Sequence, residues 1–370
     1  MEPVRVLLVF GGDSSEHEIS CLTARGVLAA VDADRFRVTC VGITSQGRWV
    51  MVPPEQVSTY QIGPDGSLPT VDPSLDDAVL VRTADGLELG RRLGDRVVDL
   101  VTVDVAFALL HGPFGEDGTI QGLFELMGVR YVGAGVLASA VCQDKVAMKH
   151  QLQAHQIPVV PFVGFDQYRW QTDRAGVLGE ISALGYPLFV KPSRGGSSIG
   201  ISRVAGEQDL EAAVSTAQRY DPTVVVEQGL DGVREIECAV LGDPGQGEVR
   251  VSLPGEIIVG GEHSFYDFEA KYLPGQPVSL DTPARLEPQV QEQVQDLALA
   301  SYRALGVEGL ARVDTFVLPT GEVLVNELNT MPGFTPTSMF PRLWEVSGLG
   351  YTDLLSTLLD MALARPLGLR

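Results

Sequence analysis

The sequence predicts a protein of mixed α/β and α+β class with three domains, the first built on a parallel sheet. An uninterrupted apolar segment at residues 5–10, followed by Gly11-Gly12, is typical of a buried parallel strand that turns into a helix. Residues 141–230 alternate helical and strand patterns, as α+β domains do. The length of 370 residues is sufficient for two or three domains with their own cores.

The first domain is expected at residues 1–140. Ser14 or Ser15 can cap a helix that continues to about residue 30. Residues 53–99 are rich in Gly, Pro and Asp and carry little chemistry, so we expect an inserted surface excursion there. The other expected elements of this domain are strands at residues 38–43 and 104–110 and a helix at residues 119–127.

The other two domains are expected at residues 141–230 and 231–370. The third should contain long strands, a β-hairpin and a C-terminal helix. The patterns predict helices at residues 139–155, 173–184, 206–219 and 287–305, and strands at residues 159–165, 188–193, 199–204 and 224–228.

A β-hairpin in the third domain is the most informative feature of the sequence. Two alternating apolar runs flank Thr320-Gly321, which is a hairpin turn signal. Side chains two apart on a strand share a face. A loop at these two residues would set Asp314 opposite Glu327 and, by the same register, Arg312 opposite Asn329.

This hairpin carries three candidate metal ligands on one face. Asp314 and Glu327 supply carboxylates and Asn329 supplies an amide oxygen, the ligands typical of Mg²⁺ that serves a nucleotide. The alternative is a hairpin with an ordinary polar outer face. The continued polar run at residues 326–333 disfavours that alternative, because a plain solvated strand has no use for it.

The segment FVKPSRGGSSIGIS predicts a strand that delivers Lys191, followed by a Gly/Ser loop. Glycines allow backbone N–H groups to approach phosphate oxygens, and Ser197 and Ser198 add hydroxyl donors. A Walker A loop requires Gly-Lys before Ser or Thr, and Gly-Lys does not occur in this chain, so a P-loop enzyme is excluded. The alternative is that the loop simply connects two strands.

Lysine usage favours phosphate binding. The chain has 23 Arg but four Lys, so lysine is rare where charge alone suffices. Lys145, Lys191 and Lys271 fall within the candidate motifs, and Lys149 is given no role. A compact ammonium on a flexible stem contacts a phosphate differently from a planar guanidinium, which is a physical reason for lysine at these positions.

Two glutamates mark strand ends that could contact a nucleoside. Glu227 ends the apolar run VVVEQGL, and Glu235 begins EIECAVLG. Backbone groups there could pair with an adenine edge, and a carboxylate could bind ribose hydroxyls. The alternative is that both are ordinary charged strand termini.

Composition limits the partners. The net charge of −21 argues against nucleic acid or an anionic membrane as a partner, and any anion-binding pocket would be a local exception. The four cysteines are scattered without metal-binding spacing, which favours reduced thiols and the cytoplasm. The apolar segment at the N-terminus is short, so neither a signal peptide nor a membrane span is expected.

Taken together, the motifs resemble the ATP-grasp superfamily and, within it, the D-alanine-D-alanine ligases. The resemblance covers nearly the whole chain and keeps the family's order of motifs. The matching segments are VFGGDSSEHEIS (9–20), HGPFGEDGTIQG (111–122), DKVAMK (144–149), FVKPSRGGSSIG (189–200), VVVEQG (224–229), SFYDFEAKYL (264–273), ARVDTF (311–316) and NELNTMPGFTPTSMFP (326–341).

The resemblance implies ATP and Mg²⁺, with Mn²⁺ as a possible substitute, and a role for each matching residue on the nucleotide side. Lys145, Lys191 and Lys271 match phosphate contacts, with Ser198 in the phosphate loop, and Glu227 and Glu235 match adenine and ribose contacts. Asp314, Glu327 and Asn329 match the ligands of two Mg²⁺ ions.

On the amino-acid side, the resemblance implies that one D-alanine carboxylate attacks the γ-phosphate and a second D-alanine displaces phosphate from the acyl phosphate. Arg312 matches the guanidinium that stabilises the acyl phosphate and the oxyanion. The remaining matches are Glu16 for the first ammonium, His111 for substrate, Ser197 and Tyr272 for loop closure with Glu16, and Gly333 with Ser338 for the second carboxylate.

The resemblance therefore implies synthesis of D-alanyl-D-alanine for peptidoglycan in the cytoplasm, and it implies a homodimer. One alternative is a ligase that uses D-lactate or D-serine as second substrate. The other is an ATP-binding regulatory protein that has lost catalysis, although all the matching catalytic residues are present.

Overall fold

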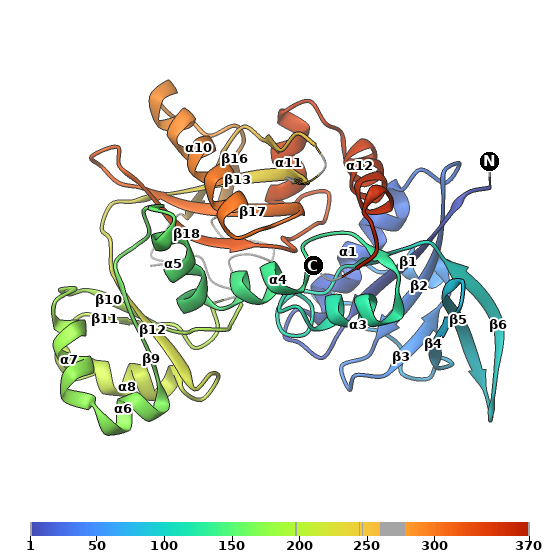
Figure 1. The fold of residues 1–370 in the computed structure, drawn as a ribbon, viewed down its shortest axis with the longest axis horizontal. Helices are drawn as coiled ribbons and strands as arrows, with labels where there is room; N and C mark the ends of the chain where they lie inside the picture. Colours follow the sequence, from blue (N-terminus) through green and yellow to red (C-terminus); the bar gives the residue numbers. More distant parts are fainter. Residues whose placement is uncertain (1, 197, 244, 246, 260–277, 369–370) are drawn as a thin grey trace.

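The computed structural model describes residues 2–196, 198–243, 245, 247–259 and 278–368 (Figure 1). The N-terminal part lies at one end of the molecule and the part around residues 160–230 lies at the other, with the C-terminal elements above and between them in this view. Within these described ranges, no helix is long and apolar enough to cross a membrane.

The predicted parallel sheet forms the N-terminal part, in the strand order β3-β2-β1-β7-β8. Strand β1 is parallel to both of its neighbours, β2 and β7, and its central side chains are fully buried, which explains the continuous apolar segment there. The bounds are Val4–Gly11 for β1, Phe36–Ile43 for β2, Trp49–Val52 for β3, Val105–Ala108 for β7 and Arg130–Tyr131 for β8.

Helix α1 (His17–Ala30) starts later than predicted, and its cap differs. Glu16 is the N-cap residue and makes no side-chain capping hydrogen bond, so the prediction of a cap by Ser14 or Ser15 is wrong. Ser20, inside the helix, instead accepts a hydrogen bond from the Gly11 amide at 2.7 Å and donates to a carbonyl after β7. The start of the helix is therefore tied to the ends of two strands, which places Glu16 at the sheet edge.

The expectation of a surface excursion at residues 53–99 is wrong for its second half. Strands β4 (Ala78–Thr83), β5 (Gly86–Leu93) and β6 (Arg96–Val103) form an antiparallel sheet after the short helix α2 (Pro54–Val57). Leu87 and Leu89 are fully buried in one core with side chains of β1. They stand two apart and share a face, a pattern that the preceding Gly, Pro and Asp residues obscured.

The central part is an antiparallel sheet in the order β11-β10-β12-β9, with helices packed on it (Figure 1). Its own core is built from apolar residues of these strands and helices. The strand bounds are Phe162–Asp166 for β9, Leu188–Pro192 for β10, Ser202–Val204 for β11 and Thr223–Gln228 for β12; the helices are α6 (Gln167–Thr172), α7 (Arg174–Ser182) and α8 (Glu207–Ala217).

The single helix predicted at residues 139–155 is two helices, α4 (Val136–Gln143) and α5 (Lys145–Ala154). Asp144 lies between them with extended backbone, and its carboxylate accepts hydrogen bonds from the amides of residues 146 and 147. The aspartate is therefore the N-cap of α5, a signal that the apolar periodicity concealed.

The C-terminal part is a mostly antiparallel sheet in the order β16-β15-β13-β17-β18, with β14 paired to β13. Helix α10 packs on β13, β17 and β18. The strand bounds are Arg234–Gly242 for β13, Arg250–Val251 for β14, Gly255–Val259 for β15, Val278–Asp281 for β16, Gly309–Val317 for β17 and Val323–Asn329 for β18. The helices of this part are α10 (Pro288–Ala304), α11 (Met339–Val346) and α12 (Tyr351–Ala364). Helix α3 (Thr119–Met127) belongs to the N-terminal part and matches the predicted helix there.

The last helix, α12, packs against both the C-terminal sheet and the N-terminal part. Leu354, Leu355 and Leu358 share one core with residues of β1 and β7 and with residues of β13 and β17, and α12 lies beside α1 in Figure 1. Arg365, directly after α12, is buried, pairs with Glu308 and donates to carbonyls at residues 131 and 133. The first and third parts are thus joined by apolar packing, and the division at residues 140 and 230 stays a prediction.

Leu87→Ala should lower the free energy of unfolding by about 2–5 kcal/mol, because it leaves a cavity in a closed core. Leu93→Ala on the same strand is the control: Leu93 is 58% exposed, and its truncation should change the stability by less than about 0.5 kcal/mol. Urea denaturation of the two variants measures both values. Equal losses would contradict the burial of this sheet in the N-terminal core.

Candidate active site

A cavity of about 1200 Å³ is lined by residues from all three parts of the chain. Every predicted site residue that the structure describes lies on this lining: Glu16, His111, Lys145, Lys191, Ser198, Glu227, Glu235, Arg312, Asp314, Glu327, Asn329, Gly333 and Ser338. The other three, Ser197, Lys271 and Tyr272, lie outside the described residues.

The predicted pairing across the hairpin is confirmed at both functional positions. Asp314 on β17 lies opposite Glu327 on β18, and Arg312 lies opposite Asn329. The four side chains therefore meet on the face of the sheet that lines the cavity.

The predicted two-residue turn of this hairpin is wrong. The Leu318 amide donates to the Glu322 carbonyl at 2.8 Å around a three-residue turn, and Thr315 lies opposite Val325, one residue out of the predicted register. The register shifts after Asp314, where Asn326 has no partner residue across the ladder. This β-bulge restores the predicted pairing where the functional residues lie.

Arg312 is the electrostatic centre of the hairpin face. Its Nε and Nη2 atoms each donate to a carboxylate oxygen of Asp314 at 2.6 Å, and Nε lies 3.0 Å from Glu237 Oε2. Burial disfavours the guanidinium charge, but the carboxylates of Asp314 and Glu237 outweigh it and raise the pKa of Arg312 well above its ordinary value. Arg312 is therefore a permanent cation at the cavity wall.

The donor set on this face fits a hard divalent cation. Asp314, Glu327 and Asn329 present carboxylate and amide groups, and oxygen ligands are those that Mg²⁺ prefers. Asn329 Nδ2 donates to Asp314 at 3.0 Å, so two of the three predicted ligands are in direct contact. Among the residues that the structure describes, no three His, Cys, Asp or Glu side chains form a metal-binding group. The predicted set has two carboxylates, and the guanidinium of Arg312 compensates one of them.

Glu237 belongs to this site and was missed from the sequence. It lies on β13, opposite Asp314 of β17, and is 4% exposed. A signal was available, because Glu237 stands two residues after Glu235 and so shares its strand face. The apolar residues that follow in EIECAVLG made a buried carboxylate difficult to recognise.

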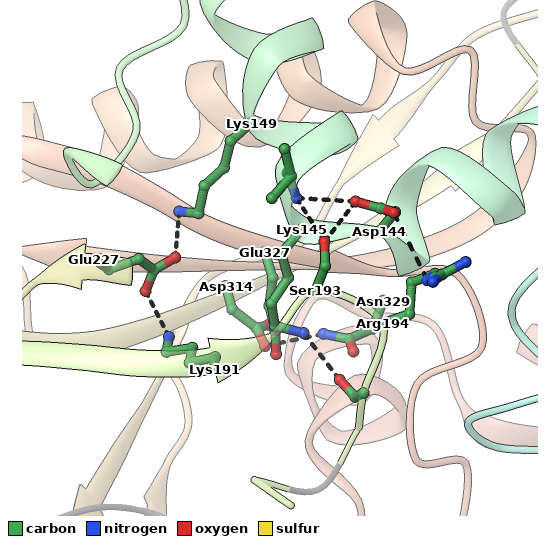
Figure 2. Close-up of polar contacts among 12 residues, drawn as sticks. Asp144, Lys145, Lys149, Lys191, Ser193, Arg194, Glu227, Asp314, Glu327 and Asn329 are labelled. Carbon is green, nitrogen blue, oxygen red and sulfur yellow. Dashed lines mark hydrogen bonds and ion pairs between the residues drawn. The ribbon is translucent and has the colours of Figure 1, made fainter. Parts of the chain in front are cut away.

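Helix α5 presents Lys145 to two other walls of the cavity. Its ammonium donates to the Gly195 carbonyl of the Gly/Ser loop at 2.9 Å and lies 3.2 Å from Glu327 Oε2 (Figure 2). One cation therefore connects the predicted phosphate loop to a predicted metal ligand.

Glu227 at the end of β12 lies between two lysines (Figure 2). Its Oε2 accepts from Lys191 at 2.6 Å, and its Oε1 lies 2.9 Å from Lys149 Nζ. Burial raises the pKa of this carboxyl, but the two ammoniums outweigh burial and lower it to about 2. Lys149, to which the sequence analysis gave no role, is thus in contact with Glu227, a residue predicted to bind the nucleotide.

The Gly/Ser loop connects β10 to β11, as predicted, and its first residues are held firmly. Ser193 donates to the Asp144 carboxylate at 2.6 Å, and Arg194 makes two side-chain hydrogen bonds to Asp221 at 2.9 and 2.7 Å. Ser198 adopts a φ of 60°, a left-handed conformation that is uncommon for a non-glycine residue. The loop is therefore fixed at its start and turns sharply at Ser198.

The opposite end of the cavity contains His111, Gly333 and Ser338. The Nδ1 atom of His111 lies 3.0 Å from the Met331 carbonyl, whereas the buried Nε2 atom has no hydrogen-bond partner among the residues that the structure describes. Ser338 accepts from the Thr335 amide at 3.1 Å, and a Cβ atom added to Gly333 would lie 3.2 Å from the Ser338 hydroxyl. The two residues predicted to act together are therefore adjacent.

Glu116 is a second carboxylate that the sequence reasoning missed. It lines the cavity and accepts a hydrogen bond from the Gly112 amide at 2.6 Å. Burial, and then the nearby Glu16 carboxylate, raises the pKa of Glu116 to about 8. Its place in HGPFGEDG was the available signal, because that motif already supplied His111.

Both halves of the chain match models of known protein families. Residues 5–134 match the model described as D-ala D-ala ligase N-terminus, and residues 151–360 match the model described as D-ala D-ala ligase C-terminus. A D-alanine--D-alanine ligase from Kineococcus radiotolerans is 53% identical over 374 aligned residues, covering 99% of this chain and 98% of that protein. One from an Arthrobacter species is 48% identical and covers 99% and 96%.

Solved structures show the same similarity. The VanG D-Ala:D-Ser ligase from Enterococcus faecalis superposes with a TM-score of 0.82 at 33% identity and covers 98% of this chain and all of that one. The D-alanine-D-alanine ligase from Coxiella burnetii gives 0.80 at 33% identity, covering 99% and 95%.

Glu116→Gln should make the stability less dependent on pH. Because the folded protein raises the pKa of this carboxyl from 4.5 to about 8, it retains a proton that the unfolded chain releases, and stability falls as the pH rises through this window. The variant cannot titrate there, so its melting temperature should fall less between pH 5 and pH 8. Glu345 is exposed, so Glu345→Gln is the control, and its melting temperature should change with pH as that of the wild type does. If the melting temperature of Glu116→Gln fell as much as that of the wild type, the raised pKa assigned to Glu116 would be contradicted.

Proposed function

The chain belongs to the D-alanine-D-alanine ligase family, and from this we propose that the cavity described above binds ATP, divalent cations and two D-alanine molecules. The protein is an ADP-forming ligase that joins two D-alanines to D-alanyl-D-alanine for peptidoglycan synthesis. The observation that carries the conclusion is that lysines and oxygen ligands from distant segments line one cavity of a chain 53% identical, along its length, to a ligase of this name.

The nucleotide is proposed to occupy the end of the cavity between β10, β12 and β13. Lys145 and Lys191 would contact its phosphates, and both ammoniums already lie against oxygen atoms. Glu227 and Glu235 would contact adenine and ribose, and both line the cavity. The loop around Ser198 would cover the phosphates, and Lys271 would add a further phosphate contact.

The divalent cations are proposed to bind at the hairpin face. Asp314, Glu327 and Asn329 would hold two Mg²⁺ ions, with Mn²⁺ as an alternative, and oxygen donors favour this metal. When bound, the ions neutralise charge on the transferring phosphoryl group. The guanidinium of Arg312, a permanent cation 2.6 Å from Asp314, would stabilise negative charge on the acyl phosphate and the tetrahedral oxyanion.

The amino acids are proposed to bind at the other end of the cavity. Glu16 would receive the first ammonium, and the buried Nε2 atom of His111, which has no partner among the described residues, would make a hydrogen bond to substrate. Gly333 and Ser338 would receive the second carboxylate, because the glycine leaves space beside the hydroxyl. Ser197 and Tyr272 are proposed to close a loop over this site with Glu16.

D-alanine is favoured as the second substrate. The relatives that are 46–53% identical over 99% of the chain are D-alanine--D-alanine ligases, whereas the D-Ala:D-Ser ligase structure is 33% identical. An inactive ATP-binding protein is not favoured, since Arg312, Asp314 and Glu327 are present and adjoin in space. A homodimer in the cytoplasm is proposed from the family resemblance; the four cysteines are buried and unpaired, which is compatible with a reducing compartment.

ATP cleavage should require D-alanine and yield ADP, phosphate and D-alanyl-D-alanine. Phosphate release with each D- and L-amino acid, followed by mass spectrometry of the product, measures this. Competition between D-alanine and D-lactate at pH 7 should give mostly dipeptide. Formation of AMP and pyrophosphate, or no turnover with D-alanine, would reject the proposed reaction.

Substitutions at the hairpin face should abolish turnover while the fold is kept. Asp314→Ala and Glu327→Ala each remove a proposed ligand, and each should lower kcat by at least about 100-fold. Arg312→Lys should cost a similar factor, because an ammonium cannot reproduce a planar donor with two bonds to one carboxylate. Near-normal rates in all three variants, with unchanged circular dichroism, would reject the assignment of this face.

A further inference from the structure

Lys149 is a charged residue near the cavity to which the proposed function gives no role. It is fully buried (0% exposed) and lies behind the lining of the cavity. Its ammonium lies 2.9 Å from Glu227 Oε1 and 5.8 Å from the centre of the Phe162 ring. Among the described residues, neither Nζ nor Oε1 has any other hydrogen-bond partner, so these two atoms depend on each other.

Helix α5 directs two lysines to two different carboxylates. Lys145 and Lys149 are one turn apart and therefore share a helix face. Lys145 reaches Glu327 on the hairpin, and Lys149 reaches Glu227 on β12 (Figure 2). The same helix thus addresses the proposed metal end and the proposed nucleoside end of the cavity.

The two lysines at Glu227 are not equivalent. The Lys191 side chain is 12% exposed and lines the cavity, whereas Lys149 is closed off from it. Glu227 therefore has two ammonium partners, one on each carboxylate oxygen. A ligand in the cavity can therefore draw Lys191 away while Glu227 keeps a counter-ion.

Without Lys149, the same movement of Lys191 would isolate the Glu227 carboxylate, which is 3% exposed. An unpaired buried charge is strongly unfavourable, so Lys191 would be retained by Glu227 and withheld from the ligand.

We propose that Lys149 is a positioning residue for the nucleotide: it remains paired with Glu227, so that Lys191 can exchange Glu227 for a phosphate oxygen. This inference rests on the proposed role of Lys191 as a phosphate contact. The competing explanation is a purely structural ion pair between α5 and β12. The two explanations predict different effects of losing Lys149. A distorted pocket would weaken the binding of every nucleoside ligand, whereas a Lys191 held by Glu227 would weaken only the binding of ligands that carry phosphates.

Lys149→Met tests the proposal, because it removes the charge and keeps most of the side-chain length. ADP and adenosine are measured as inhibitors that compete with ATP. The inhibition constant of ADP should rise by about 10- to 100-fold, the usual effect of losing a partner that orients a binding group. That of adenosine, which has no phosphate, should change by less than threefold. An unchanged constant for ADP, or equal increases for both inhibitors, would overturn the proposal.

A double-mutant cycle with Glu227→Gln gives an independent test. With a neutral amide at position 227, Lys191 leaves no carboxylate behind, so adding Lys149→Met should change the ADP constant by less than threefold. A tenfold loss in this background would overturn the proposal. Should Lys149→Met alone fail to fold, the comparison of Glu227→Gln with the double variant decides the question, because neither contains an unpaired buried carboxylate at this position.

Two further variants separate the possible failures. Arg365→Met removes another buried cation, the partner of Glu308, away from the cavity lining; it should lower the melting temperature and leave ADP inhibition unchanged. Lys191→Met should raise the ADP constant directly. Normal ADP inhibition in Lys191→Met would reject the proposed phosphate role itself, whereas an effect in Lys191→Met without one in Lys149→Met would reject the Lys149 proposal alone.

Discussion

Strand β17 is paired along both edges, with β13 and with β18, and the geometry of the site depends on this double pairing. Because both neighbours fix the strand, Arg312 and Asp314 face the cavity while Val313 between them is fully buried. A slip of one residue would move the charges into the core and Val313 into the cavity. The three-residue turn sets a register that is one residue out, and the bulge at Asn326 corrects it before the charged positions are reached.

The charges of the cavity are compensated within the protein. In a chain of net charge −21, Arg312 lies against Asp314 and Glu237, Lys145 against Glu327, and Lys191 against Glu227. On the proposed function, ligand binding at this site would be an exchange of partners rather than the addition of a charge. Phosphate groups would replace carboxylates at the lysines, and divalent cations would replace ammonium or guanidinium at the carboxylates. A nucleotide that arrives with its cation would satisfy both exchanges together, which avoids leaving a buried charge unpaired.

The sequence predicted those parts of the fold and site that depend on local patterns. The facing pairs of the hairpin followed from strand alternation around a turn signal, and the parallel sheet followed from the apolar segment of β1. The features that were missed depend on distant neighbours. Glu237 becomes part of the site because β13 lies beside β17, and Asn326 bulges because the turn and the sheet require different registers. Similarly, Leu87 and Leu89 are core residues because β5 packs against the parallel sheet, which no local pattern specifies.

The rarity of lysine in this chain also indicates where a compact buried charge is needed, including at a position outside the predicted roles. The three lysines that the structure describes each place the ammonium within 3.2 Å of a carboxylate oxygen, and all are 13% exposed or less. Arginine is used instead at exposed ion pairs such as Arg5 with Asp104, and at Arg312, where one carboxylate takes two parallel hydrogen bonds. A guanidinium in place of Lys149 would bring five donors into a site that offers one carboxylate oxygen, whereas an ammonium is a compact charge. The argument from lysine usage that singled out Lys145 and Lys191 therefore holds for Lys149 for the same physical reason.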